Sequence, residues 1–218
     1  AAEGARIGVE AARSAAEALS NVRVDMGPRA SSPRRGQQPS ECAEVEDGEA
    51  MIALNAMVQM DAEQAMPLLR KVMARRDRCS EVMRRRAVFL IAQKRTADVA
   101  DLLIDAARND PDKEVRAQAV YYLARVPGPR SLAFLREVAT RPGDTDVRQR
   151  AVYALATMKT PEARAALRDV AASRDTDVEV RADAIYRLGT SGSAEDLAFV
   201  RELYPRLESR ELKERALN

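Results

Sequence analysis

A short pattern recurs along the chain at intervals of 32 or 33 residues. Its copies begin at Met83, Val115, Val147, Val180 and Leu212, and a basic residue follows each of these positions. A weaker copy spans residues 49–57. A fixed period of this length is typical of repeat proteins, in which each unit stacks on its neighbours. The sequence therefore predicts an array of similar units.

Each unit is predicted to contain two helices. A second apolar string precedes each copy, as in Leu135-Arg136-Glu137-Val138 and Leu167-Arg168-Asp169-Val170. Both strings carry apolar residues at helical spacing, which predicts two short amphipathic helices per unit, A and then B. Residues that favour the N-cap position stand three places before the B strings: Ser80, Asp112, Asp144, Asp177 and Ser209.

An A helix, an Asp-rich turn and a B helix that begins Val-Arg resemble the HEAT-like repeat, in the short form found in many bacterial proteins. The resemblance covers residues 46–218 and implies an all-α, right-handed α-solenoid of about five helix pairs. Residues 1–45 do not fit it and are predicted to form an N-terminal helix followed by an irregular arm or linker. Because the last copy stops at Asn218 within its B helix, we expect a fragment or further repeats.

One basic residue of each B helix falls within the buried arc of that helix. These residues are Arg84, Arg116, Arg148 and Arg181, with Lys213 in the last copy. A charge in a buried arc needs a partner, and the Asp residues of the preceding turns are the candidates: Asp112, Asp144 and Asp177. The resemblance implies the same arrangement, because HEAT-like repeats stack such Arg and Asp residues into a ladder between units. We interpret these residues as structural.

One aromatic residue per repeat lies roughly opposite the apolar arc of the B helix. The resemblance places B helices on the concave surface, where these rings would form a stripe bordered by charged and amide groups. Tyr and Arg are enriched at interface hot spots, so the stripe is a candidate partner-binding surface. The alternative is that each ring packs against the next repeat and only seals the stack. The candidate residues are Arg86, Phe89, Gln118, Tyr121, Arg125, Arg150, Tyr153, Asp183 and Tyr186.

The two cysteines, Cys42 and Cys79, precede the B strings of adjacent repeats. Packed helices lie about 10 Å apart, so the leading turns of these helices can approach disulfide range. A bridge would place the protein outside the cytosol, in the periplasm. Two free thiols would instead leave it in the cytoplasm.

The composition excludes several classes of function. The sequence has no His, which removes most catalytic triads and most zinc sites. It contains no phosphate-binding glycine loop, no dinucleotide fingerprint and no apolar run of the roughly 20 residues that span a bilayer. We therefore predict a non-enzymatic scaffold without a cofactor, which binds another protein or an extended peptide.

Nucleic-acid binding through an Arg-lined groove is the alternative function. The densest basic run, over residues 70–86, would suit an acidic partner or a phosphate backbone. The favoured interpretation is a solvent-exposed edge of the array, whose charge Asp77 and Glu81 balance. A net charge of only +2 makes a nucleic-acid partner the less favoured of the two.

Overall fold

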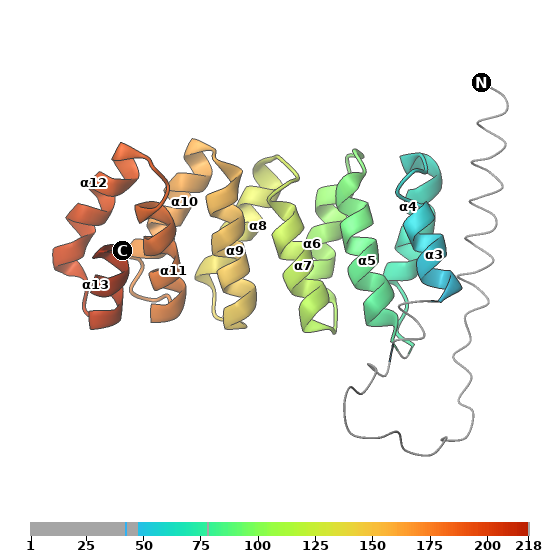
Figure 1. Cartoon of the computed structure of the whole chain (residues 1–218), viewed down its shortest axis with the longest axis horizontal. Coiled ribbons are helices and arrows are strands. Elements are labelled where there is room, and N and C mark those ends of the chain that lie inside the picture. Colours follow the sequence, from blue (N-terminus) through green and yellow to red (C-terminus); the bar gives the residue numbers. More distant parts are fainter. Residues whose placement is uncertain (1–41, 43–47, 78, 218) are drawn as a thin grey trace, which may run out of the picture. The chain divides into compact units, whose positions relative to one another are not determined.

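The computed structural model describes residue 42, residues 48–77 and residues 79–217. Within these residues it contains eleven α-helices, one short 3-10 helix and no strand (Figure 1). The predicted all-α repeat fold is confirmed. The N-terminal helix and arm predicted for residues 1–45 lie outside the described residues, apart from Cys42. The chain divides into two compact units, residues 1–96 and residues 97–218.

Unit 1 contains helices α3 (Glu49–Ala56), α4 (Ala62–Met73) and α5 (Ser80–Gln93). Apolar side chains of all three helices form its core, because α4 and α3 both pack on α5. Lys94, directly after α5, is buried and donates hydrogen bonds to three carbonyl oxygens after α3, those of Met57, Val58 and Met60, at 2.8, 3.2 and 2.6 Å. Burial lowers the pKa of Lys94. Its ammonium group therefore satisfies the main-chain acceptors that follow α3.

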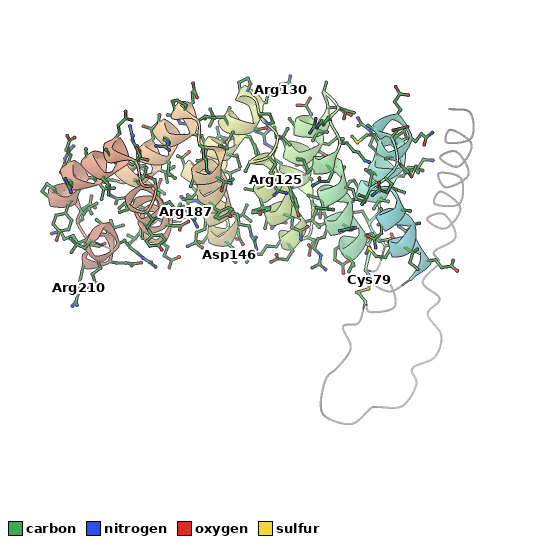
Figure 2. The ribbon with its side chains drawn as sticks, turned by 45° about the horizontal axis from the view of Figure 1, so that its top comes forward. Cys79, Arg125, Arg130, Asp146, Arg187 and Arg210 are labelled. Atoms are coloured by element: carbon green, nitrogen blue, oxygen red, sulfur yellow. A yellow bond between two sulfur atoms is a disulfide. The ribbon has the colours of Figure 1, made fainter. Side chains whose placement is uncertain are left out.

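Unit 2 contains four helix pairs in regular alternation. The A helices are α6 (Val99–Asn109), α8 (Pro129–Thr140), α10 (Pro161–Ala172) and α12 (Ala194–Leu203), and the B helices are α7 (Lys113–Leu123), α9 (Thr145–Met158), α11 (Val178–Gly189) and α13 (Arg210–Leu217). The 3-10 helix η1 (Tyr204–Arg206) joins α12 to α13. A helices pack on A helices and B helices on B helices, which gives two layers (Figure 1). The first turns of α8 and α9, marked by Arg130 and Asp146, lie at opposite edges (Figure 2).

The core of unit 2 lies between the two layers. The apolar positions of each amphipathic helix meet there, and small alanines such as Ala119, Ala151 and Ala184 let neighbouring helices approach closely. Large apolar side chains from both layers fill the space between them, and solvent does not reach them. These side chains are Leu103, Leu123, Leu135, Leu155, Ile185 and Leu188.

Three of the predicted N-cap residues accept hydrogen bonds from the first turns of their helices. Asp112 accepts from the N–H of Val115 at 2.9 Å. Asp144 accepts from the N–H groups of Asp146 and Val147, at 3.0 and 3.2 Å. The hydroxyl of Ser209 accepts from the N–H of Leu212 in α13 at 3.2 Å. Each cap satisfies main-chain donors that have no partner within the helix and so fixes where the helix begins.

The other two predicted caps have different roles. Ser80 is the first residue of α5 and not its cap, because the residue before it, Cys79, has a left-handed conformation with a φ of 60°. The Ser80 hydroxyl donates to the carbonyl of Asp77 at 2.6 Å. Asp177 occupies the N-cap position of α11, but its carboxylate pairs with Arg148 and not with main-chain N–H groups.

The carboxylates at the turns make the stability of the fold sensitive to acid. The N–H of Val147 holds the pKa of Asp144 below its ordinary value of 3.8. The main-chain N–H of Glu208 itself, followed by Arg181, likewise lowers the pKa of Glu208 from 4.5. Because both values are lower in the folded chain, their stabilisation is complete above the unfolded values and is lost as the pH falls through the folded ones.

We therefore expect the thermal midpoint to change little between neutral pH and about pH 5 and to fall below about pH 4. Circular dichroism melting curves would measure it. Asp144→Asn, which keeps a capping oxygen but removes the charge, should reduce the acid sensitivity. A midpoint that stays constant down to pH 3 would contradict the assignment.

Candidate interaction surface

Three B helices each place one tyrosine on the outer side of unit 2. The residue just before each tyrosine is buried in the core: Val120, Val152 and Ile185. The tyrosine that follows it therefore points away from the core. These tyrosines are Tyr121, Tyr153 and Tyr186, and together they are called the tyrosine stripe below. Tyr121 is half-buried, whereas Tyr153 and Tyr186 are 38% and 39% exposed.

The rings of the tyrosine stripe also contact the neighbouring repeats. Tyr121 and Tyr153 are stacked, with ring centroids 5.7 Å apart and planes 20° apart. The guanidinium of Arg187 lies 4.8 Å from the ring centroid of Tyr153, and that of Arg215 lies 5.8 Å from Tyr186. Each ring therefore packs on the next repeat and still offers part of its surface to solvent.

A pocket of about 370 Å³ lies beside the stacked pair. Its charges are balanced across the repeats: Arg150 lies 3.8 Å from Glu114, and Asp146 pairs with Lys113. That pairing raises the pKa of Lys113. Figure 2 shows that Asp146 and Arg187 come from neighbouring B helices. The residues that line the pocket are Glu114, Tyr121, Asp146, Gln149, Arg150, Tyr153 and Arg187.

The structure brings only some of the predicted stripe residues to this pocket. Gln118 and Arg125 lie on or just after α7 and do not line it. Asp183 lies beside it and pairs with Arg187 at 3.0 Å. Arg86 and Phe89 belong to unit 1, where the guanidinium lies 4.6 Å from the ring centroid.

The prediction missed the acidic residues that border the tyrosines. Glu114 precedes Tyr121 by seven residues, and Asp146 precedes Tyr153 by the same spacing. Seven residues are close to two helical turns, so each acid lies on the same face as its tyrosine. That spacing was the available signal, and it identifies the surface as mixed in charge.

Two of the predicted ladder arginines connect adjacent repeats. Arg148 is buried and pairs with Asp177 of the following turn, not with Asp144 of its own turn. Arg181 is also buried and pairs with Glu208 at 3.2 Å, again in the following turn. In both pairs the carboxylate faces the arginine of the repeat before it, so the partner differs from the preceding-turn candidate, while the pairs lie between repeats as the resemblance implies.

The other two ladder arginines, Arg116 and Arg84, donate hydrogen bonds to uncharged oxygen atoms. Arg116 donates to the carbonyl oxygens of Asp110 and Pro111, at 2.8 and 3.1 Å. Asp144, which would continue the ladder to Arg116, caps α9 and lies 3.5 Å from Lys113. Arg84 donates to the carbonyl of Arg75 and to the hydroxyl of Ser80.

A second set of ion pairs joins the A helices of unit 2. The arginine of the recurring Leu-Arg-acid-Val string reaches the next repeat: Arg136 lies 2.7 Å from Asp169. Arg168 binds Asp196, a carboxylate that is 1% exposed. The string gave a signal for the Arg136–Asp169 pair alone, since this pair joins the second position of one copy to the third position of the next. The A-helix pairs are Arg108–Glu137, Arg130–Asp101, Arg136–Asp169, Arg164–Asp196, Arg168–Asp196 and Arg168–Glu195.

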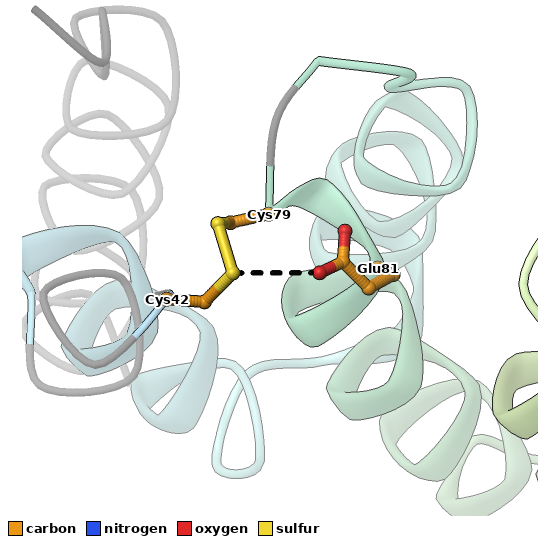
Figure 3. A group of neighbouring side chains, drawn as sticks. All are labelled: Cys42, Cys79 and Glu81. Carbon is orange, nitrogen blue, oxygen red and sulfur yellow. Dashed lines mark hydrogen bonds between the residues drawn. A yellow bond between two sulfur atoms is a disulfide. The ribbon is translucent and has the colours of Figure 1, made fainter. Parts of the chain in front are cut away.

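The two cysteines are joined in unit 1 (Figure 3). The bridge, which was one of two alternatives from the sequence, links Cys42 to the residue before α5. A carboxylate oxygen of Glu81 lies 3.5 Å from the Cys42 sulfur. These three groups lie within 4.8 Å of one another, as metal ligands do, but sulfurs that are bonded together are not thiolate ligands.

Comparison with known proteins supports the repeat architecture. A protein-family profile described as HEAT repeats matches residues 66–156 and residues 138–218. No curated protein matches the sequence. None of the helices in the described part of the chain combines the length and the apolar character needed to cross a membrane.

Proposed function

The chain belongs to the HEAT repeat family, and from that premise we propose that it is a non-enzymatic scaffold that binds a partner protein or extended peptide along the tyrosine stripe. Proteins of this architecture offer a continuous surface built from equivalent positions of successive repeats. The observation that carries the proposal is the partial exposure of Tyr153, which lines a pocket with a charged rim, and of Tyr186 on the next B helix.

The chemistry of the stripe suits an extended polypeptide. Tyrosine presents a large, rigid contact area at a low cost in conformational entropy, and its hydroxyl can donate and accept. Neighbouring B helices are about 10 Å apart, which corresponds to about three residues of extended chain. A partner segment that crosses the helices would therefore meet one tyrosine for about every three of its residues.

The described surface gives no specific support to a nucleic-acid partner. Arg150 lies near Glu114, and Arg187 is paired with Asp183. Phosphate binding depends on cations that exchange their counterions for the backbone, and these arginines already have carboxylates beside them.

We also propose that the protein works in an oxidising compartment. A disulfide between Cys42 and Cys79 persists where thiols are not kept reduced, as in the periplasm or outside the cell. This proposal rests on the bridge alone and is independent of the tyrosine stripe.

Replacing Tyr121, Tyr153 and Tyr186 together with Ala tests the stripe. Short peptides selected from a random display library against the wild-type chain provide the ligands. We expect their affinity to fall by about 100-fold or more in the triple variant, because interface hot-spot residues each contribute about 2 kcal/mol. The measurement is isothermal titration calorimetry with the selected peptides.

The control is Tyr204→Ala, which removes a half-buried aromatic residue of η1 that lies outside the stripe. It should leave peptide affinity unchanged. The melting temperature of the triple variant should stay within a few degrees of the wild type. A large loss of thermal stability would show that the rings chiefly seal the stack, and unchanged affinity would place the binding surface elsewhere.

A further inference from the structure

A second pocket, of about 340 Å³, lies at the edge of unit 2 where A helices end and B helices begin. Four arginines line it, Arg108, Arg116, Arg141 and Arg148, together with Glu137 and Asp144. Apolar side chains, including Phe134 and Val138, line it as well. The pocket does not share a residue with the one beside the tyrosine stripe.

Both carboxylates of this pocket already have donors. Glu137 accepts from Arg108 at 2.9 Å and from Arg141 at 2.8 Å. Asp144 caps α9 and lies 3.5 Å from Lys113. Arg148 is neutralised by Asp177, so the four arginines exceed the three acids by one charge, and the pocket is electropositive.

The excess charge is concentrated at a gap in the arginine ladder. Arg148 and Arg181 each have a carboxylate from the following turn, whereas the hydrogen bonds of Arg116 go to carbonyl oxygens. No carboxylate partner of Arg116 occurs among the residues that the structure describes. The neighbouring Arg148 is buried, and its Nε has no hydrogen-bond acceptor within the same part of the chain. Asp144, the carboxylate at the ladder position of this pocket, caps α9 and lies near Lys113, and it forms no ion pair with Arg116.

We propose that the pocket binds a small carboxylic acid with an apolar body. Its carboxylate would accept hydrogen bonds from Arg116, and its apolar body would lie against Phe134 and Val138. The planar guanidinium fork matches a carboxylate, and the apolar wall distinguishes such a ligand from inorganic phosphate. Glu137 and Asp144 also disfavour an anion of higher charge. A free acid and the C-terminal residue of a polypeptide share this chemistry.

Binding of benzoate to the full chain tests the proposal. Benzoate, benzamide and inorganic phosphate are titrated separately, and amide chemical shifts are followed by NMR. We expect benzoate to shift the amides of the turn around Gly143 in a saturable way. Benzamide, which lacks the charge, and phosphate, which lacks the apolar body, should each bind at least tenfold more weakly.

Variants of Arg116 assign the anion-binding group. Arg116→Gln should weaken benzoate binding at least tenfold, and Arg116→Lys, which keeps the charge without the fork, should weaken it less. Arg201→Gln changes an exposed arginine of α12 that does not line the pocket; it is the matched control and should leave benzoate binding unchanged. If Arg116→Gln does not fold, the comparison of benzoate with benzamide on the wild-type chain decides the matter alone.

Three results would overturn the proposal. Equal binding of benzoate and benzamide would show an apolar pocket without anion recognition. Tighter binding of phosphate than of benzoate would exclude the carboxylate class. Full benzoate affinity in a folded Arg116→Gln variant would exclude the role of that residue.

The source of the carboxylate is resolved by a further pair of probes. N-acetylphenylalanine and its amide represent a polypeptide C-terminus with and without its charge. If the acid binds more tightly than benzoate and the amide does not bind, a polypeptide terminus is the natural ligand. If benzoate binds more tightly than N-acetylphenylalanine, the ligand is a free acid, and the site stands in either case.

Discussion

Replacing Asp196 with Ala should lower the free energy of unfolding by about 3 kcal/mol or more. The Asp196 carboxylate is 1% exposed and binds Arg168 through two nitrogens, at 3.0 and 2.5 Å. It also accepts from the hydroxyl of Ser191 at 2.9 Å and lies 3.4 Å from Arg164. Its removal breaks all of these hydrogen bonds to a buried charged acceptor at once, and this loss dominates the effect, because Arg168 and Arg164 are 27% and 36% exposed and stay partly solvated.

The matched control for this substitution is Asp169→Ala. Asp169 forms the equivalent A-helix pair one repeat earlier, 2.7 Å from Arg136, but both side chains are more than half exposed. An exposed pair contributes at most about 1 kcal/mol, because water solvates both partners after the change. The two substitutions therefore remove the same chemical group from pairs that differ in burial.

Urea denaturation of both variants, followed by circular dichroism, measures the difference. Asp196→Asn should fall between the wild type and Asp196→Ala, because the amide keeps the shape of the group and one acceptor oxygen. Equal losses for Asp196→Ala and Asp169→Ala would show that burial of the carboxylate does not control the contribution of these pairs.

Breaking the Cys42–Cys79 bridge should destabilise unit 1 by about 4 kcal/mol in the chain-entropy description. The bridge closes a loop with a sequence separation of 37 residues, and this loop contains α3 and α4. Without it, α3 is held mainly by its packing on α5 and by the Lys94 hydrogen bonds after its end. The effect should therefore be local.

Hydrogen exchange resolves this local effect, because it reports the opening of separate segments. In the Cys42→Ser/Cys79→Ser variant, the amides of α3 and α4 should exchange faster, while those of α9 should keep their protection. Reductant should reproduce the change in the wild type and have no effect on the variant. Unchanged protection of α3 and α4 would contradict a stabilising role, and free thiols in protein isolated from its native cells would contradict the oxidising compartment.

The periodicity of the sequence was sufficient to predict the helix pairs, because the residues that start and shape each helix lie within the same repeat. Asp112 and Asp144 cap helices that begin immediately after them, and the tyrosine stripe follows from the position of each ring within one helix. All these features depend on residues that are close in sequence. A single repeat therefore contains the information needed to predict them.

The partners of charged groups could not be predicted in the same way. The pairing of Arg148 with Asp177 depends on how one repeat is positioned against the next. The sequence period gives the length of a repeat but not this relative position. The burial of Asp196 depends on arginines about one repeat away. Lys94 was missed because its acceptors are carbonyl oxygens, which leave no trace in the pattern of side chains.

The nearest-neighbour packing of unit 2 has a mechanical consequence. Within the described residues of this unit, the helices pack mainly against helices of the same repeat or of the adjacent ones, so the packing between neighbours holds the array together. Under tension, such an array would lengthen at low force, because each repeat can separate from its neighbours without unfolding the others. A ligand that contacts Tyr121, Tyr153 and Tyr186 would connect three successive repeats. Its binding would therefore make this part of the array stiffer along its length.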